Sequence, residues 1–503
     1  MPPYFIAFLA TIAVSPRFAI LLVYNTSMTV RTRIAPSPTG IAHLGTAYTA
    51  MRNLAIAKQA GGQFIIRIED TDRERFVEGA VEVIFDAMKW LGLPYDEAPN
   101  IGGPYAPYTQ SDRLPIYQKH VLDLIENDKA YYCFCTKDRL DQVRADQQAK
   151  KELPRYDKFC RQIDLIEAKK RVEAGEKYVI RLKVPETGVT ICQDVVRGPI
   201  EFENSGIDDQ VLLKSDGYPT YHLGVVVDDH LMKITHVIRG EEWLSSTPKH
   251  VLIYNAFGWE LPTFAHLPVI RNKDHSKMSK RKNDVSILSH RDRGYLPEAV
   301  NNFLALMGWS HPEKKDIFDL DEFLKLFTLE RITLTAPVYD IDKLNWINGM
   351  YIRAMSDVEL ALRLEPFVPS DCTVEMLALT LPLIKERLVT LKDFESLTDF
   401  FYRDISIDQV MLTKKSTVEE VAAQLIATKT ELSALEDKDW THENIEYKVR
   451  SLAEANGWKP GQYFMMLRVA VTGKTATPPL FETMAVLGRE KTLNRLGQSA
   501  SGN

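Results

Sequence analysis

Residues 33–45 read RIAPSPTGIAHLG, a loop with two prolines and two glycines that separates a strand-like stretch from a helix-like one. The stretch VRTRIA at 30–35 favours a strand, and residues 46–59 favour a helix. A second strand, QFIIRIED at 63–70, and a second helix over 77–91 follow. Because strands that alternate with helices pair in parallel through right-handed crossovers, this order predicts a doubly wound α/β domain.

The next strands of such a sheet come much later in the chain. The apolar stretches YHLGVVVDDH at 221–230 and ITHVIRGEEW at 234–243 are predicted as strands, and residues 247–259 as a helix. Between about 103 and 215 lie a helical piece with cysteines and several short strands, among them KYVIRLKV, TICQDVVRGPIEF and QVLLKSDG. We therefore expect a separate inserted domain to split the sheet.

The chain becomes helical beyond about residue 283. From residue 357 onward apolar residues recur at i, i+3 and i+4, as in 374–394 and 418–435. The sequence thus predicts a Rossmann-like α/β domain split by an inserted α+β domain and followed by all-α domains. The predicted parts are an N-terminal extension at 1–27, the first half of the α/β domain at 28–110, the insertion at 111–215, the second half at 216–275, a basic loop with a following domain at 276–350, and a helical domain at 351–503.

Composition narrows the class of protein. With 503 residues, 45% of them hydrophobic, the chain can bury several cores. A net charge of -6 argues against a uniformly basic coat for nucleic acid, although a local basic patch can still bind RNA. Five cysteines in so long a chain do not make a disulfide framework, so we expect a reducing, cytoplasmic environment.

The first 27 residues differ from the rest because two apolar runs flank Ser15-Pro16-Arg17. The segment is too broken to predict a membrane span, and we expect no membrane association. It matches neither a signal peptide nor a transit peptide well. Our interpretation is that translation begins at Met28; a genuine targeting or membrane segment is the alternative.

The loop at 33–45 predicts a nucleotide site. It lies at the carboxyl end of a parallel strand, where open α/β folds bind ligands. Glycines let the backbone approach a nucleotide, and the helix that begins near His43 offers N–H groups to phosphate. When His43 is considered alone, a structural role in the turn explains it as well as phosphate binding does. A second segment of interest is the basic stretch RNKDHSKMSKRKND at 271–284, called here the second basic segment. By itself it is equally compatible with a solvated loop without a function.

Together the two segments resemble the paired motifs of class I aminoacyl-tRNA synthetases. His43-Leu44-Gly45-Thr46 occupies the place of the first motif, with Thr46 in place of its final histidine, and Lys277-Met278-Ser279-Lys280-Arg281 occupies that of the second. The stretches RIAPSPTG, IRIEDTD, LKSDGYPTYHL, VVDDHLM and HVIRGEEWL are similar to glutamyl-tRNA synthetases of the bacterial type. This resemblance extends from about residue 30 to the C-terminus.

The resemblance implies that glutamate is activated with ATP and Mg²⁺ to glutamyl-adenylate and passed to the terminal adenosine of tRNA(Glu). Such an in-line displacement depends on orientation and on neutralised phosphate charge, without a protein nucleophile. The residues that the resemblance assigns to catalysis are His43, Lys277 and Lys280. Those assigned to ATP are Gly40, His43, Gly45, Thr46, Glu242 and Lys280, and those assigned to glutamate are Arg33, Ala35, Ser37, Glu69, Tyr221 and Arg239.

Two of these residues have chemistry that suits glutamate in particular. A guanidinium such as that of Arg239 can form a bidentate pair with the side-chain carboxylate, and Glu69 suits the α-ammonium group. A site built around a buried cation loses a charge-assisted pair when offered glutamine. The related glutaminyl-tRNA synthetases are not expected to carry this arginine. Trp243 matches a position that lines the same pocket.

Cys133, Cys135, Tyr156 and Cys160 bring three thiols and a phenol together in sequence. Zinc prefers four ligands, and a CxC pair alone is weak evidence for it. By the resemblance, some family members hold a structural zinc ion at such positions, with tyrosine or histidine as the fourth ligand. Gln162 stands where that histidine would be, so Tyr156 would have to serve. Three reduced thiols without metal are the alternative.

The helical C-terminal part resembles an anticodon-binding region, with Arg387 and Arg468, followed by Thr472 and Gly473, at contact positions. If Arg387 reads the last anticodon base, only tRNA(Glu) is charged; otherwise tRNA(Gln) is charged as well. A glutamate-activating paralogue and a non-catalytic RNA-binding protein are the rival hypotheses. Intact motifs argue against the second, and we expect a monomer.

Overall fold

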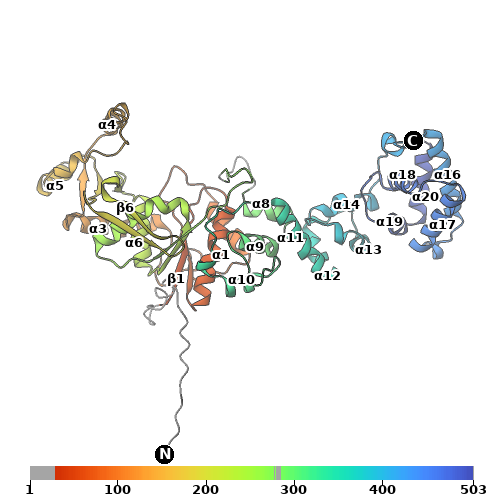
Figure 1. Ribbon diagram of the computed structural model, residues 1–503, viewed down its shortest axis with the longest axis horizontal. Coiled ribbons are helices and arrows are strands. Elements are labelled where there is room, and N and C mark those ends of the chain that lie inside the picture. Colours follow the sequence, from red (N-terminus) through yellow and green to blue (C-terminus); the bar gives the residue numbers. More distant parts are fainter. Residues whose placement is uncertain (1–28, 277, 279–284, 502–503) are drawn as a thin grey trace, which may run out of the picture.

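The computed structural model describes residues 29–276, 278 and 285–501. The molecule is elongated, with an α/β body at one end of its long axis and the helices α13–α20 at the other (Figure 1). Lys277 and Lys280, two of the predicted catalytic residues, lie outside the described residues. Among the described helices, none is long and apolar enough to cross a membrane.

A six-stranded sheet of order β2-β1-β8-β9-β5-β6 organises the α/β body. Its parallel core consists of the strands β1 (Arg31–Ile34), β2 (Gln63–Ile66), β8 (His236–Gly240) and β9 (Thr263–Leu267). Helices α1 (Leu44–Gln59), α2 (Ala80–Trp90) and α7 (Thr247–Phe257) connect or cover these strands. β1 is buried at every position, as expected for a parallel strand covered on both faces. The prediction of a Rossmann-like α/β domain is confirmed.

The prediction of a strand over 221–230 is wrong, because these residues form helix α6 (Tyr221–Leu231). Val225, Val226 and Val227 are all buried in a core shared with the inserted domain. The two aspartates that follow are buried as well, where arginines bind them. A short apolar run that is buried on every side has no period that separates helix from strand, and the valines biased the interpretation.

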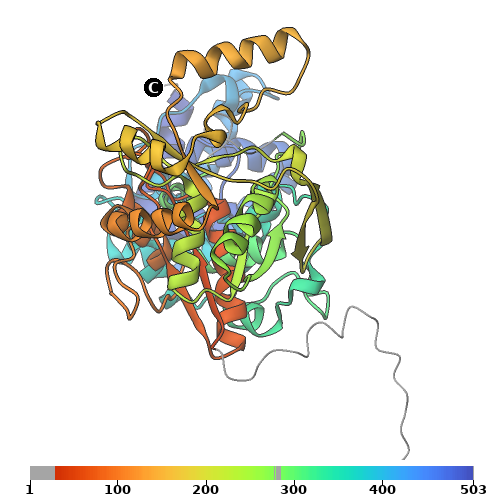
Figure 2. The same ribbon diagram turned by 90° about the vertical axis from the view of Figure 1, so that its left-hand side faces the viewer.

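The insertion has a small sheet of its own. Strands β3 (Ala130–Cys133), β4 (Val179–Leu182) and β7 (Val211–Leu213) pair antiparallel in the order β3-β4-β7. Helices α3 (Leu114–Glu126), α4 (Lys137–Ala149) and α5 (Leu165–Glu173) accompany it. Helix α4 has no buried residue and stands off from the body (Figures 1 and 2).

Part of the stretch assigned to the insertion belongs to the main sheet instead. Strands β5 (Val189–Asp194) and β6 (Gly198–Glu203) form a hairpin that pairs with β9 through Asp194 and Phe264. Cys192 of β5 packs with Phe264 and Val237 in one core cluster. The assignment of the whole range 111–215 to a separate domain is therefore wrong for this hairpin, because alternate β5 residues are buried against the α/β body.

The remaining helices build two successive cores. The first continues from the sheet through α8 (Ile287–Asp292), α9 (Pro297–Leu306), α10 (Leu320–Leu326), α11 (Ile341–Ala354), α12 (Asp357–Leu364) and α13 (Val374–Ile384) to Phe394. The second extends from Phe400 to Leu496 and includes α14 (Asp393–Tyr402), α15 (Gln409–Leu412), α16 (Val418–Ser433), α17 (His442–Ala455), α18 (Pro460–Thr472), α19 (Leu480–Leu487) and α20 (Arg489–Ser501). The prediction of a helical C-terminal region is confirmed, with the break between cores between Phe394 and Phe400.

Candidate active site

A cavity of about 830 Å³ opens at the carboxyl ends of β1 and β8. It is lined by the loop after β1, the start of α1, the start of α6 and the turn after β8. Most of the residues predicted for ATP and glutamate share this lining, namely Arg33, Ala35, Ser37, His43, Gly45, Thr46, Glu69, Tyr221, Arg239, Glu242 and Trp243. Gly40 does not line it; this glycine turns the loop with a positive φ of 108°.

His43 caps helix α1 and faces the cavity. Its Nδ1 accepts a hydrogen bond from the Gly45 N–H at 3.1 Å, so the neutral ring carries its proton on Nε2. The first turn of α1 contains no acidic residue, which leaves the positive end of the helix available to an anion. A Cβ at position 45 would lie 3.3 Å from His43 Nδ1, so glycine there gives the imidazole room. This arrangement suits a phosphate group.

The residues that directly follow the second basic segment lie beside His43. His43 and Ser286 form an antiparallel bridge, and the Leu44 N–H donates to the Val285 carbonyl at 2.9 Å. Met278 is buried in the same core cluster as α1. Met278 and residues 285–286 thus lie beside α1, while Lys277 and Lys280 are outside the described residues.

A buried network of charges forms the wall beside β1. Arg33 donates to both carboxylate oxygens of Asp229, at 3.0 and 2.9 Å, and Arg67 donates to the same carboxylate at 2.7 Å. Arg67 also lies 3.2 Å from Glu69. Burial raises the pKa of Glu69 to about 7, against the opposing effect of Arg67 and Arg33. The wall therefore carries a carboxyl group that titrates near neutral pH.

Arg239 lies at the far side of the cavity, 6% exposed. It donates four hydrogen bonds, to Tyr221, Thr247, His250 and His266. Among the described residues no ion pair includes Arg239, unlike Arg33. Its positive charge therefore faces the cavity without a carboxylate of the protein beside it.

The turn after β8 completes the lining. Trp243 lies against the Tyr221 ring with a centroid distance of 4.2 Å. The Glu242 carboxylate folds back over Gly240, where any Cβ would overlap it at about 2.0 Å. Burial raises the pKa of Tyr221, so its hydroxyl keeps its proton while the oxygen accepts from Arg239. Tyr221 can therefore donate to an anion bound in the cavity.

Sequence reasoning missed several residues that hold this site. Asp229 and Arg67 fix Arg33, and His250, His266 and Thr247 fix Arg239. The adjacent aspartates 228 and 229 in an apolar run were a usable signal, because buried carboxylates require cationic partners. The histidines carried no such signal, since a lone histidine in an apolar segment is usually structural.

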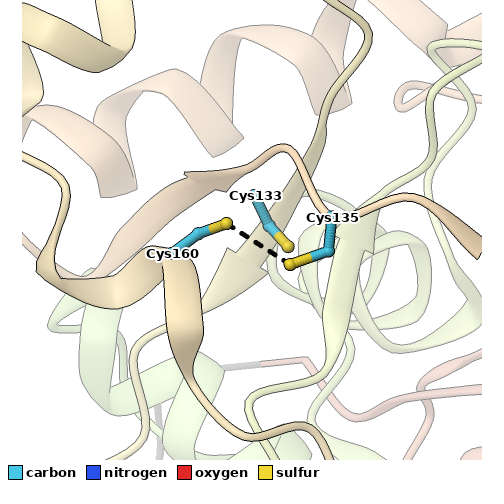
Figure 3. Close-up of side chains that lie close together, drawn as sticks. All are labelled: Cys133, Cys135 and Cys160. Carbon is cyan, nitrogen blue, oxygen red and sulfur yellow. Dashed lines mark hydrogen bonds between the residues drawn. The ribbon is translucent and has the colours of Figure 1, made fainter. Parts of the chain in front are cut away.

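Three of the four predicted metal ligands, Cys133, Cys135 and Cys160, converge in the inserted domain (Figure 3). The Sγ atoms of Cys133, Cys135 and Cys160 lie within 4.8 Å of one another, with 3.5 Å between those of Cys135 and Cys160. The Tyr156 hydroxyl lies 3.3 Å from the Cys133 sulfur and 3.6 Å from that of Cys135. The hydrogen bond from Cys160 lowers the pKa of Cys133 to about 4. Thiolates bound to tetrahedral zinc at about 2.3 Å are roughly 3.8 Å apart, so the cluster fits such an ion.

The two predicted anticodon arginines lie near each other in the helical region. Arg387, in the 3-10 turn Lys385–Arg387, is exposed. Burial lowers the pKa of Arg468, and the charge of Arg387 lowers it further. Arg468 already donates to the backbone oxygens of Thr477 and Pro478, at 3.2 and 2.7 Å. Arg387 is therefore the one better placed to contact an RNA base.

Thr472 and Gly473 have structural surroundings. The Thr472 hydroxyl donates to the Arg468 carbonyl at 2.6 Å and is buried. Gly473 ends α18 with a φ of 70°, and a Cβ there would lie 2.8 Å from the Ser406 carbonyl oxygen. These contacts stabilise the end of the helix and do not point to RNA.

The split parallel sheet and the capped helix N-terminus in the cavity are consistent with the catalytic domain of a class I aminoacyl-tRNA synthetase. The protein-family model described as tRNA synthetases class I (E and Q), catalytic domain, matches residues 29–346. A second family model, described as anticodon binding domain, matches residues 359–500. The chain belongs to this family. Curated relatives that are 46% and 48% identical over 93% of the chain place it among the glutamate–tRNA ligases.

Individual relatives support this placement over nearly the whole chain. Glutamate–tRNA ligases of Dehalococcoides mccartyi and Thermus thermophilus are 46% and 48% identical, over 93% of this chain and 97% and 99% of theirs. The solved glutamate tRNA ligase of Elizabethkingia meningosepticum, in complex with its amino acid, superposes with a TM-score of 0.84 at 36% identity. That match covers 94% of this chain and 99% of the other.

Proposed function

We propose that the cavity binds ATP and L-glutamate side by side, and that the chain activates glutamate and transfers it to the terminal adenosine of tRNA(Glu). The observation that carries this proposal is the buried Arg239, which presents a charge without a protein counter-ion to the same cavity that holds the N-terminus of α1. One end of the cavity thus suits a carboxylate and the other suits a phosphate.

On the nucleotide side, His43 donates from Nε2 to a phosphate oxygen, and the backbone around Gly45 and Thr46 receives the triphosphate. Lys277 and Lys280 of the second motif add positive charge, and Glu242 binds another part of the nucleotide. Mg²⁺, when bound to the triphosphate, supplies further neutralisation of its charge. None of these residues needs to form a covalent intermediate.

On the glutamate side, the side-chain carboxylate accepts from Arg239 and from the Tyr221 hydroxyl. Four of the five Arg239 N–H groups are engaged by protein, so one donor from each residue fits the geometry better than a bidentate pair with the arginine. Glu69 binds the α-ammonium group. Ala35 and Ser37 from the loop and Arg33 from β1 close the remaining sides.

The ionisation of Glu69 predicts a pH dependence. Above about pH 7 its carboxylate is charged and can pair with the α-ammonium of glutamate, whereas below that pH it binds a proton and loses the pair. We expect kcat/KM for glutamate to fall by about tenfold per unit as pH drops below 7. Steady-state charging at pH 6 to 8 measures this. The Glu69→Gln variant should show a low and flat profile, and a flat profile in the unaltered enzyme would contradict the assignment.

The reaction and its tRNA specificity are tested by charging tRNA(Glu) and tRNA(Gln) transcripts with labelled glutamate, with glutamine as the control amino acid. We propose a discriminating enzyme in which Arg387 reads the last anticodon base. The Arg387→Ala variant should narrow the preference for tRNA(Glu) by about tenfold or more. Arg450, an exposed arginine of α17 paired with Glu446, is the matched control.

The outcomes of that assay separate the alternatives. Charging of both tRNAs by the unaltered enzyme would show a non-discriminating form and remove the role of Arg387. Charging of neither would favour a paralogue that activates glutamate for another acceptor. The match of the anticodon-binding family over residues 359–500 supports the tRNA-charging enzyme.

We propose one structural zinc ion at Cys133, Cys135, Tyr156 and Cys160. Elemental analysis of the purified protein should find about one Zn²⁺ per chain. The Cys135→Ser variant should lose it and melt at a lower temperature, while Cys372→Ser, at a buried cysteine of another core, should retain it. Equal zinc content in both variants would contradict the site.

The five cysteines of the sequence are all free thiols in the structure. They support a reducing compartment, and we propose a cytoplasmic monomer. Size-exclusion chromatography with light scattering checks the second part of this proposal.

A further inference from the structure

The side chains that surround the Arg239 guanidinium are all uncharged acceptors. Nε donates to His266 Nε2 at 3.0 Å, and Nη2 donates to Thr247 Oγ1 at 3.0 Å. Nη1 donates to the Tyr221 hydroxyl and to His250 Nδ1, both at 3.1 Å. A guanidinium has five N–H groups, so one on Nη2 remains for a ligand. The protein holds the plane of Arg239 on three sides without neutralising it.

The other arginine of the glutamate site is treated differently. Arg33 shares Asp229 with Arg67, and all three side chains are nearly inaccessible to solvent. A carboxylate in the same relation to Arg239 would balance its charge and weaken its attraction for a substrate carboxylate. The choice of histidine and threonine at these positions therefore has a chemical consequence beyond packing.

Each histidine must present a lone pair to Arg239, and its second nitrogen shows how this is ensured. His266 Nδ1 donates to the Asp194 carboxylate at 2.6 Å, which leaves Nε2 as the acceptor. Asp194 belongs to the β5–β6 hairpin and is fixed by the backbone N–H groups of Val196 and Arg197. The hairpin thus acts on the site through His266.

His250 has the opposite tautomer. Its Nδ1 accepts from Arg239, so its proton lies on Nε2 and is donated to His222 Nδ1 at 3.1 Å. Burial lowers the pKa of His250 and, with the Arg239 charge, holds it far below its usual range; burial also lowers the pKa of His266. Both rings are uncharged at neutral pH and keep their lone pairs.

We propose that His250 and His266 are positioning residues that make the cavity select a carboxylate over a carboxamide. They fix the guanidinium with one N–H turned to the substrate, and as neutral groups they leave its positive charge to be balanced by the substrate alone. This inference rests on the proposed function of the cavity as a glutamate site. It extends that function by stating why the site rejects glutamine.

Substitutions at His250 separate geometry from charge. His250→Asn keeps an acceptor near the Nδ1 position, His250→Leu removes it at similar volume, and His250→Asp keeps it but adds a negative charge. All are measured by charging of tRNA(Glu), with KM for glutamate, KM for ATP and the preference for glutamate over glutamine as readouts. His230→Leu, which removes a histidine stacked on Trp259 outside the cavity lining, is the control.

We expect His250→Leu to raise KM for glutamate by about 10- to 100-fold, because a buried charged donor loses its acceptor. KM for ATP should not change. His250→Asn should restore KM to within roughly threefold of the unaltered enzyme, since an amide oxygen is a comparable acceptor. His250→Asp should lower the preference for glutamate over glutamine by about 100-fold, as expected for a pre-paired cation.

Thermal melting shows whether His250→Leu folds. If it does not, His250→Asn and His250→Asp, which have side chains of the same size and differ in charge, still test the inference. Equal glutamate preference in these two variants would overturn the inference, and so would an unchanged KM in a folded His250→Leu. Asp194→Asn gives a second measure. The asparagine amide can donate to His266 Nδ1, which moves the ring proton to Nε2 and removes the acceptor for Arg239, so KM for glutamate should rise. Failure of the unaltered enzyme to charge tRNA(Glu) would instead overturn the proposed function.

Discussion

Replacing Arg239 with glutamine should lower kcat/KM for glutamate by about 10³-fold, because the substrate carboxylate loses the one buried cation that it meets directly. Glutamine is shorter than arginine by about two bonds and carries no charge. It also leaves some of the acceptors His250, His266, Tyr221 and Thr247 without a donor, which adds a cost even without substrate. Charging of tRNA(Glu) under subsaturating glutamate measures the effect.

The control for this variant removes an arginine that lies outside the cavity lining. Arg363 of α12 pairs with Glu298 at the surface, and Arg363→Gln should charge tRNA(Glu) normally. Arg239→Lys is informative as well: it keeps the charge but offers three donors from one point, so recovery should be partial. A kcat/KM for Arg239→Gln within about tenfold of the unaltered enzyme would mean that another group binds the carboxylate.

The effect of Arg239 should exceed that of the histidines behind it. Removal of His250 disturbs one of four hydrogen bonds to the guanidinium, whereas removal of Arg239 removes the charge itself. A larger effect in His250→Leu than in Arg239→Gln would show that the histidine acts by supporting the fold of the wall.

The strand, loop and helix at the start of the α/β domain were predictable because their local signals agree. The stretch at 30–35 favours a strand, the loop carries prolines and glycines, and α1 begins directly after the capping residue His43. Helix α6 was not predictable in this way. Its valines favour a strand locally, and its helical state depends on burial against the insertion, which lies far away in sequence.

The hairpin β5–β6 illustrates the same limit for domain boundaries. Its sequence lies between elements of the insertion, but its alternating buried face packs on β9, about seventy residues further along. No local pattern states which sheet a hairpin joins. For that reason the boundary of the inserted domain was predicted in the wrong place. The contact between Asp194 and His266 was not predicted either.

Most of the predicted site residues that the structure describes line one cavity, whereas the residues that orient them were not found from the sequence. His43, Glu69, Tyr221 and Arg239 share one cavity lining. The partners that fix tautomers and guanidinium planes come from α6, α7 and β9, and their roles follow from distances that sequence does not contain. Arg468 shows the opposite error. The family resemblance predicted an RNA contact for it, but its guanidinium donates to the backbone of Thr477 and Pro478.

Replacing His43 should lower kcat by about 100- to 1,000-fold with little change in KM for ATP, because the histidine donates where phosphate charge develops. This proposed role stands beside the one that the structure shows, the capping of α1 through Nδ1. His43→Asn separates them. Asparagine is a favourable N-cap whose short amide cannot reach as far as Nε2, so it should preserve the melting temperature while losing the catalytic effect.

His43→Ala should show the same loss of kcat together with a loss of stability of about 1 kcal/mol, the usual cost of an N-cap. Ser356, which caps α12 by accepting from the Glu359 N–H, provides the matched control. Ser356→Ala should cost similar stability and leave kcat unchanged. Nearly full kcat in His43→Asn would show that the histidine acts only as a cap. The activation step would then depend on the N–H groups at the start of α1 and on the positive charge that we propose for the lysines of the second motif.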